Sequence, residues 1–217
     1  MAVRLTLTFF ALIALGSEYA HANDQVERHR GNKSKPTFFI GELAAGAAFG
    51  TGFEEGGNGY ALRTVFGFGG AFKGFPPRFY FIVSGRYASL SANVQNGTSY
   101  SDIRRDLIDV SAGLRVLVPV HRFRFLGEVT MGQSVVNSAV TVNDRESYTS
   151  SQGRFTIYTA LGAQYRFHRN LSLGLMAEWA LPTSRASRDY VIEVSRMEDS
   201  GKMHGWTSVT GAVVIHF

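Results

Sequence analysis

Hydrophobic residues alternate with polar or small residues along most of the chain beyond position 36. In the first such stretch, Phe39, Leu43 and Phe49 fall on one side of an extended backbone, whereas Ile40 and Glu42 fall on the other. Successive side chains of a β-strand point to opposite faces, while the residues on one face of a helix recur every three to four positions. The period of two therefore predicts strands.

Seven further segments show the same alternation. Their hydrophobic positions lie within residues 60–72, 79–87, 108–118, 123–135, 155–167, 171–181 and 209–217. A tilted strand needs about 9–11 residues to cross the hydrocarbon core of a membrane, and most of these segments reach that length. The pattern predicts an all-β fold, an eight-stranded antiparallel transmembrane up-and-down β-barrel.

The connections between the predicted strands are short on one side and mostly long on the other. Residues 73–77, 119–122 and 168–170 form the short ones, and the longer ones include 91–105, 137–152 and 182–203. Short periplasmic turns, long external loops and periplasmic termini are typical of bacterial outer-membrane barrels. We therefore expect both ends of the barrel domain to lie in the periplasm.

The charged residues indicate which face of each strand meets lipid. A soluble barrel of the lipocalin type would show the same alternation, with its hydrophobic face inside and a solvated outer face rich in lysine. After residue 22, however, lysine occurs only at Lys33, Lys35, Lys73 and Lys202, outside the strand cores. The polar faces carry arginine and carboxylates among Gly, Ala and Ser, and arginine pairs bidentately with carboxylates in confined sites. We predict that the polar faces line a narrow lumen.

Nine charged residues are predicted to line this lumen. They are Glu42, Arg63, Arg86, Asp109, Arg115, Arg124, Glu128, Arg166 and Glu178. An eight-stranded barrel is only wide enough for side chains to fill, and unpaired buried charges are costly, so we expect an Arg–carboxylate network that plugs the lumen. Counting along the strands places Arg63, Arg86, Asp109 and Glu178 in an upper group and the others in a lower one. The alternative is a gate that passes small solutes.

The first 22 residues are predicted to be a signal peptide. Arg4 supplies a positive start, residues 5–15 are apolar, and Ala20-His21-Ala22 places small residues before a cut at Asn23. Eleven apolar residues fall short of the ~20 that a membrane-spanning helix needs. We expect export, a polar periplasmic leader over 23–36, and the barrel over 37–217.

Composition excludes several kinds of chemistry. With no cysteine, the chain has no disulfide, thiolate metal site or cysteine nucleophile, and its six histidines do not lead us to predict a metal site or cofactor. The 22 Lys and Arg against 17 Asp and Glu give a net charge of +5, but the excess falls on the predicted periplasmic side, at positions such as Arg122 and Arg169. This distribution argues against a nucleic-acid partner, and a basic rim could instead meet anionic headgroups or cell-wall polymers.

Taken together, residues 37–217 resemble the small eight-stranded outer-membrane barrels of the OmpA/OmpX and opacity-protein type. The last strand ends in Phe217, with Ile215 and Val213 at every second position before it. This ending resembles the C-terminal signal that the barrel assembly machinery reads. The resemblance implies a location in the bacterial outer membrane, with its lipids, lipopolysaccharide and assembly machinery as partners.

The long connections carry the functional hypotheses. Asn96-Gly97 and Asn143-Asp144 are hairpin-turn signals, and 189–194 alternates like a strand, so strands are expected to project above the membrane and offer edges to a surface ligand. We therefore predict a structural and adhesion-like role and no enzymatic activity. A narrow pore is the first alternative. The second is an outer-leaflet lipid-modifying enzyme, similar to the lipid A palmitoyltransferase and deacylase, with Asp199, His204 and Ser208 as candidates by position only.

Overall fold

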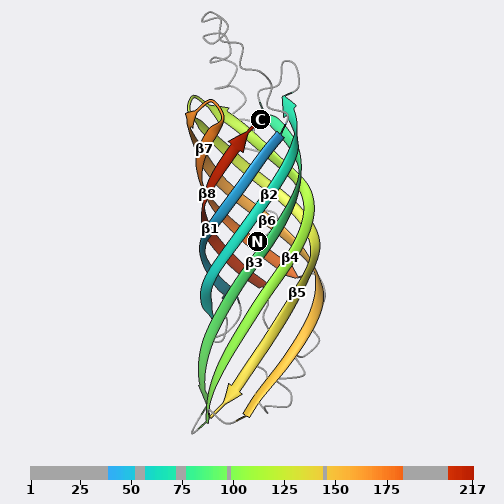
Figure 1. Cartoon of the computed structure of the whole chain (residues 1–217), viewed down its shortest axis with the longest axis vertical. Helices are drawn as coiled ribbons and strands as arrows, with labels where there is room; N and C mark the ends of the chain where they lie inside the picture. Colours follow the sequence, from blue (N-terminus) through green and yellow to red (C-terminus); the bar gives the residue numbers. More distant parts are fainter. Residues whose placement is uncertain (1–38, 52–56, 72–76, 97–98, 144–145, 183–204) are drawn as a thin grey trace, which may run out of the picture.

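A computed structural model describes residues 39–51, 57–71, 77–96, 99–143, 146–182 and 205–217. Within them the chain forms eight strands arranged as a closed barrel (Figure 1). None of the described residues belongs to a helix long and apolar enough to cross a membrane. The predicted signal peptide and leader lie outside the described residues and stay predictions.

The strands differ nearly twofold in length. In chain order they are β1 Phe39–Thr51, β2 Asn58–Ala71, β3 Arg78–Asn96, β4 Ser99–Val120, β5 Phe123–Val142, β6 Glu146–His168, β7 Leu171–Pro182 and β8 Gly205–His216. Each strand pairs antiparallel with the next, and β1 also pairs with β8, for example Leu43 with Val213. The predicted up-and-down barrel is confirmed.

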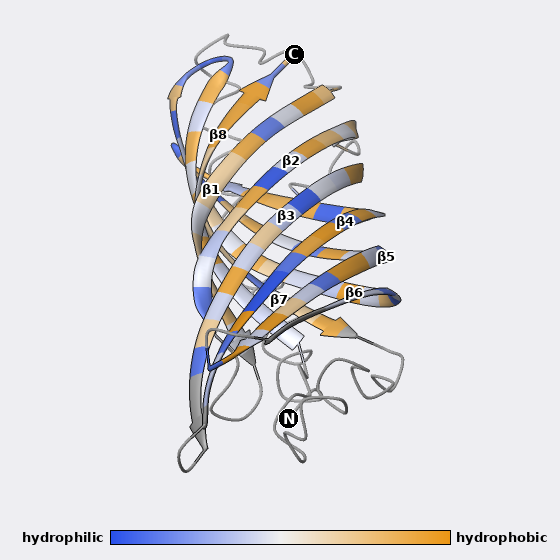
Figure 2. Ribbon diagram, turned by 60° about the horizontal axis from the view of Figure 1, so that its bottom comes forward, coloured by the Kyte–Doolittle hydropathy of each residue, from blue (hydrophilic) through white to orange (hydrophobic). Residues whose placement is uncertain are grey.

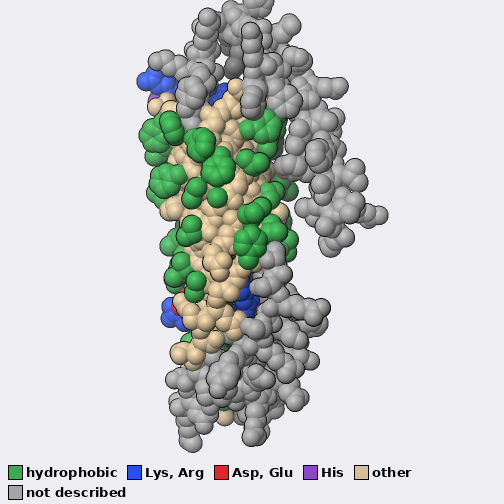
Figure 3. All heavy atoms as spheres, turned by 90° about the vertical axis from the view of Figure 1, so that its right-hand side faces the viewer, with side chains coloured by type: hydrophobic (Ala, Val, Ile, Leu, Met, Phe, Trp, Pro, Cys, Tyr) green, Lys and Arg blue, Asp and Glu red, His purple; other side chains and the backbone are tan. Residues whose placement is uncertain are grey.

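The alternation of hydrophobic and polar residues decides which side chains face outward. Large hydrophobic side chains are exposed around the whole barrel, including Phe66 at 72% and Leu114 at 59%. Figure 2 shows the hydrophobic and polar bands alternating along the strands. On the face shown in Figure 3, hydrophobic side chains cover the middle of the wall and basic side chains lie toward its ends. Such a continuous apolar belt is incompatible with water but suited to lipid, so the barrel is transmembrane.

The two ends of the barrel differ in the connections that they hold. The turn end holds the short connections β2–β3, β4–β5 and β6–β7 together with Phe217. The β4–β5 turn is only two residues, His121 and Arg122, and His121 adopts a left-handed backbone with φ 57°. The hairpin end, opposite, holds the β3–β4 and β5–β6 connections.

The four central strands extend much farther at the hairpin end than β1, β2, β7 and β8 do (Figure 1). β3 and β4 stay paired to Asn96 and Ser99, and β5 and β6 to Val142 and Glu146. This pairing agrees with the expectation, drawn from the turn signals at 96–97 and 143–144, that strands within the connections 91–105 and 137–152 project above the membrane. Residues 189–194 lie outside the described residues.

The β5–β6 reversal is tied to β4 through Asn143. This residue has φ 48°, a conformation that asparagine tolerates better than most residues. Its backbone N–H donates to the carbonyl of Tyr100 at 2.8 Å, and its Oδ1 accepts the N–H of Tyr100 at 2.9 Å. The tips of the two hairpins are thus hydrogen-bonded to each other.

Candidate functional site: a layered lumen and an external polar pocket

The inward-facing side chains form layers of different chemistry along the lumen. Along β5, Arg124 at the turn end is followed by Leu126, then by Glu128. One apolar cluster lies between the turn-end arginine and the central charges, and comprises Ile40, Val65, Tyr80, Ile82, Leu117, Leu126, Ala160 and Met176. A second lies on the hairpin side of the central charges, and comprises Ala48, Ala61, Ala88, Leu90, Leu107, Val136, Tyr158, Ala180 and Trp206. The lumen is therefore packed with side chains of both kinds.

A glycine in the wall of the barrel makes room for the first apolar cluster. A Cβ placed on Gly67 would lie 2.8 Å from Ile82 Cγ2 and 2.9 Å from Ile40 Cγ1. Glycine at this inward position makes room for two isoleucines from the neighbouring strands. Small residues on the polar faces therefore accommodate apolar side chains as well as arginines.

Arg115 is the most enclosed member of the central charged layer, with none of its side chain exposed. Its Nη1 donates to Glu42 Oε2 at 2.7 Å, across the lumen on β1. Its Nε and Nη2 donate to Glu128 Oε2 at 3.0 and 2.9 Å. These charge-assisted bonds offset the cost of removing three ions from water.

Arg86 is bound even more densely. Its Nε donates to both oxygens of Glu178 at 3.0 and 2.9 Å, and its Nη1 donates to Asp109 Oδ1 at 3.1 Å. Its guanidinium carbon lies 4.1 Å from the centre of the Tyr158 ring, which adds a cation–π contact. Ser84 accepts a further bond from Nη1 at 2.8 Å.

Arg63 joins the two arginine sites into one network. It pairs with Glu128, and it lies 3.6 Å from both Glu42 and Glu178. The prediction of separate upper and lower groups is therefore wrong. The strands of a barrel are staggered, so residues at different positions along their strands meet at one height.

Seven of the nine predicted lumen residues meet in this central network. They are Glu42, Arg63, Arg86, Asp109, Arg115, Glu128 and Glu178. Arg124 and Arg166 do not join it. Arg166 donates to the backbone carbonyls of His168 and Arg169 at 3.4 and 2.9 Å. Grouping these two with Glu42, Arg115 and Glu128 was therefore incorrect.

Arg124 belongs to a separate turn-end layer. Its side chain is buried, and none of the ion pairs between described residues includes it. Its Nη1 lies 2.9 Å from His216 Nε2, and Ser172 Oγ lies 3.0 Å from the same nitrogen. Sequence reasoning missed His216 and Ser172, although both occupy inward positions of their strands.

Two further buried arginines, Arg105 and Arg154, lie at the hairpin end. Both were assigned to connections or strand boundaries and so were missed. The alternation Arg105, Leu107, Asp109 along β4 already carried the signal, because it continues the inward face without a break. Polar residues on both faces had obscured it.

Of the three residues proposed by position for lipid chemistry, only Ser208 is described. Its side chain is buried on the inner side of β8, away from the lipid-facing surface where an acyl substrate would lie. Asp199 and His204 lie outside the described residues. The predicted assembly-signal residues Val213, Ile215 and Phe217 are exposed on the outer side of β8.

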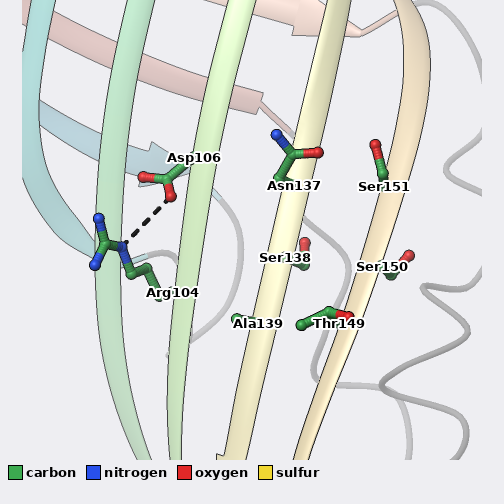
Figure 4. A pocket seen from close by; sticks show the side chains of 8 residues that line it. All are labelled: Arg104, Asp106, Asn137, Ser138, Ala139, Thr149, Ser150 and Ser151. Atoms are coloured by element: carbon green, nitrogen blue, oxygen red, sulfur yellow. Dashed lines mark ion pairs between the residues drawn. The ribbon is translucent and has the colours of Figure 1, made fainter.

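An external pocket lies just beyond the apolar belt at the hairpin end (Figure 4). Arg104, Asp106, Asn137, Thr149 and Ser151 are among its lining residues, and its volume is ≈ 260 Å³. Arg104 Nε lies 3.4 Å from Asp106 Oδ2. The next outward position on β4 toward the membrane is the exposed Ile108, so the pocket marks where the wall changes from apolar to polar.

Comparison of sequences gives no match to a family model and none to a curated protein. Solved structures do match. Neisserial surface protein A is 13% identical, with a TM-score of 0.50 over 84% of this chain and 99% of that chain. Ail, the attachment invasion locus protein of Yersinia pestis, is 11% identical, with a TM-score of 0.42 over 82% of this chain and 95% of that chain.

At these identities the structural likeness concerns the fold. The first match extends over nearly the whole of the other barrel, and the topology, strand number and apolar belt agree with it. The chain has the fold of the small eight-stranded outer-membrane β-barrels.

Proposed function

We propose that this protein resides in the bacterial outer membrane with its turn end in the periplasm, that its lumen is sealed, and that it interacts with surface ligands through its projecting strands. The main support for the surface interaction is the four-stranded sheet formed by the outer parts of β3–β6. A sheet of this length beyond the apolar belt is unnecessary for holding a barrel in lipid.

The projecting sheet has two edges. β2 pairs with β3 only as far as Ser91, and β7 pairs with β6 only as far as Thr156. Beyond these points no described strand continues the pairing on the outer side of β3 or of β6. Unpaired backbone N–H and C=O groups accept an extended peptide as a further strand, which suits a protein ligand.

The outer surface of the sheet supports the same role. The pocket in Figure 4 combines a guanidinium, a carboxylate, an amide and hydroxyls within a small area. Tyr87 Oη donates to Asp106 Oδ1 at 3.0 Å, which holds the carboxylate in place beside Arg104. These groups offer directional hydrogen bonds to a polar ligand at the membrane surface.

The sealed lumen is proposed from its packing. The central network and the two apolar clusters, whose side chains are buried inside the barrel, support it. In planar lipid bilayers we expect no steady current from the wild-type protein, and none from Glu128→Ala or Arg86→Ala. A steady single-channel current from the wild type would support the narrow pore instead.

The interaction role is tested by shortening one hairpin in register. Ala139 pairs with Thr149, and Ser138 pairs with Ser150. Replacing residues 139–149 with Asn-Gly leaves the remaining pairs aligned. Bacteria that express this variant should adhere at least tenfold less to epithelial cells or to polystyrene than bacteria with the wild type.

The matched control is Arg122→Gln, at the opposite end of the barrel. It should leave adhesion unchanged, and heat-modified migration in gels should show that both variants fold. Adhesion by the shortened variant at the wild-type level would contradict the proposed role.

The remaining partners are proposed from the outward surface. Lipids and lipopolysaccharide would contact the apolar belt, and the assembly machinery would read Val213, Ile215 and Phe217 on the exposed side of β8. Phe217→Ser should lower the yield of folded protein in the outer membrane and raise the amount of periplasmic unfolded chain, as seen by protease sensitivity in fractionated cells.

A further inference from the structure

The turn-end layer contains a buried cation whose charge has no counterpart among the described residues. Arg124 is 3% exposed, and no ion pair between described residues reaches it. A buried charge is tolerated when it is paired or held by hydrogen bonds. Otherwise its burial costs roughly several kcal/mol of folding free energy. In the central layer, by comparison, each arginine lies within 4.0 Å of at least two carboxylates.

The groups nearest to Arg124 do not supply the missing charge. Its Nη1 lies 2.9 and 3.2 Å from the two ring nitrogens of His216. Arginine can only donate, so a ring nitrogen must accept with its lone pair, and that imidazole contributes no negative charge. Two further cations, Arg78 and Arg166, repel Arg124. The Tyr80 phenol acts in the opposite sense but is no carboxylate.

A second buried polar group in this layer has no hydrogen-bond partner in the part of the chain that the structure describes. Gln164 pairs with Arg124 across β5 and β6, and its side chain is 1% exposed. Neither its Nε2 nor its Oε1 has a hydrogen-bond partner. Its Cγ lies over Gly174, where an added Cβ would be 3.3 Å away, so the amide extends toward β7.

Four consecutive strands therefore bring polar side chains to one place. β5 contributes Arg124, β6 contributes Gln164, β7 contributes Ser172 and β8 contributes His216. Arg78 and Arg166 are only half-buried at the mouth, where they give the approach a positive potential. Guanidinium forks, amide N–H groups and hydroxyls are the donors that bind phosphate oxygens.

We propose that the turn-end mouth of the lumen is a binding site for a phosphate group, held by Arg124 together with Gln164 and Ser172. The bound anion would supply the charge that Arg124 lacks and accept the bond that the Gln164 amide does not make. The group could be free inorganic phosphate or the headgroup of an anionic phospholipid. The site does not depend on the proposed surface interaction, which lies at the other end of the barrel.

The test uses the refolded full chain in zwitterionic micelles, with the imidazole resonances of His216 as the reporter. Sodium phosphate should shift them saturably, whereas sodium chloride at equal ionic strength should not. Arg124→Gln should weaken phosphate binding at least tenfold. The matched control Arg122→Gln removes an exposed arginine two residues away and should bind as the wild type does.

A second arm distinguishes the two sources of phosphate. In nanodiscs, a response to phosphatidylglycerol without a response to free phosphate assigns the site to a lipid headgroup, and a response to free phosphate assigns it to the soluble anion. Should Arg124→Gln fail to fold, Ser172→Ala and Gln164→Leu should each weaken binding at least threefold. The proposal is overturned if the wild type responds to neither source, or if its response is unchanged in Arg124→Gln or, failing that, in both of the other variants.

Discussion

The central and the turn-end layers of the lumen both bury arginine, but they treat its charge in opposite ways. Arg115 is bound to Glu42 and Glu128 through three donated hydrogen bonds, whereas Arg124 contacts a histidine and is repelled by two further arginines. The central layer has four carboxylates for three guanidiniums, and the turn-end layer has none among the described residues. Burial alone therefore does not determine how much an arginine contributes to stability, because that contribution depends on its partners.

The largest effect is expected from Arg115→Met. The substitution leaves Glu42 and Glu128 buried without their main partner, and breaking a buried ion pair from one side costs about 3–5 kcal/mol. Urea unfolding in lipid vesicles, followed by tryptophan fluorescence, measures the loss. Adding Glu128→Gln to the same chain should restore part of it. A loss no greater than that of Arg124→Met would remove the contrast between the two layers.

A smaller effect is expected where the central layer meets its apolar neighbour. Tyr158 lies under the Arg86 guanidinium and 6.2 Å from the Trp206 ring. Tyr158→Leu should cost about 2 kcal/mol, because it removes a desolvated cation–π contact. Tyr158→Phe keeps the ring and should cost less. Equal losses for the two variants, measured by the same unfolding titration, would show that the ring face contributes nothing.

Arg124→Met should change stability little in buffer free of phosphate. No carboxylate is left unpaired, and replacing a poorly compensated buried charge by an apolar side chain is often neutral or stabilising, so we expect a change within about 1 kcal/mol. The same urea titration measures it. A loss as large as that of Arg115→Met would mean that Arg124 has an acidic partner outside the described residues.

The smallest effect is expected at the exposed pair in the external pocket. The Arg104 side chain is mostly exposed, and its Nε lies 3.4 Å from Asp106 Oδ2. Exposed ion pairs contribute about 0–1 kcal/mol, so Arg104→Met should leave the free energy of unfolding almost unchanged. This variant adds a solvent-exposed arginine to the comparison between the central and the turn-end layers. A loss above that range would indicate that the pocket stabilises the projecting sheet.

The barrel itself could be predicted because a single physical rule governs every strand. Lipid on one side and a narrow lumen on the other force alternation, and residues such as Leu114 outside and Arg115 inside obey it. The rule weakens beyond the membrane, where both faces meet water. This explains why the turn signals at 96–97 and 143–144 predicted projecting strands, whereas the alternation did not show how far the outer parts of β3–β6 stay paired.

The lumen could be predicted only in part. Alternation identifies which charges point inward, and seven of the nine do meet. It cannot give their heights, because the stagger between strands is a property of the closed barrel. Arg63 was thus separated from Glu42 and Glu128, and the pairing of Arg124 with His216 across the lumen could not be foreseen.

The pairing of β1 with β8 affects how quickly the barrel can fold and insert into the membrane. Every other pair joins neighbours in the chain, whereas the seam brings Ile40 to His216. Hairpins can zip up one after another, but the ring cannot close until residues 205–216 arrive. Contacts so distant in sequence are slow to form, and until then the first and last strands would leave bare amide groups facing hydrocarbon. Closure of the barrel is therefore expected to limit the rate of membrane insertion. A chain whose sheet has not closed should be degraded by proteases.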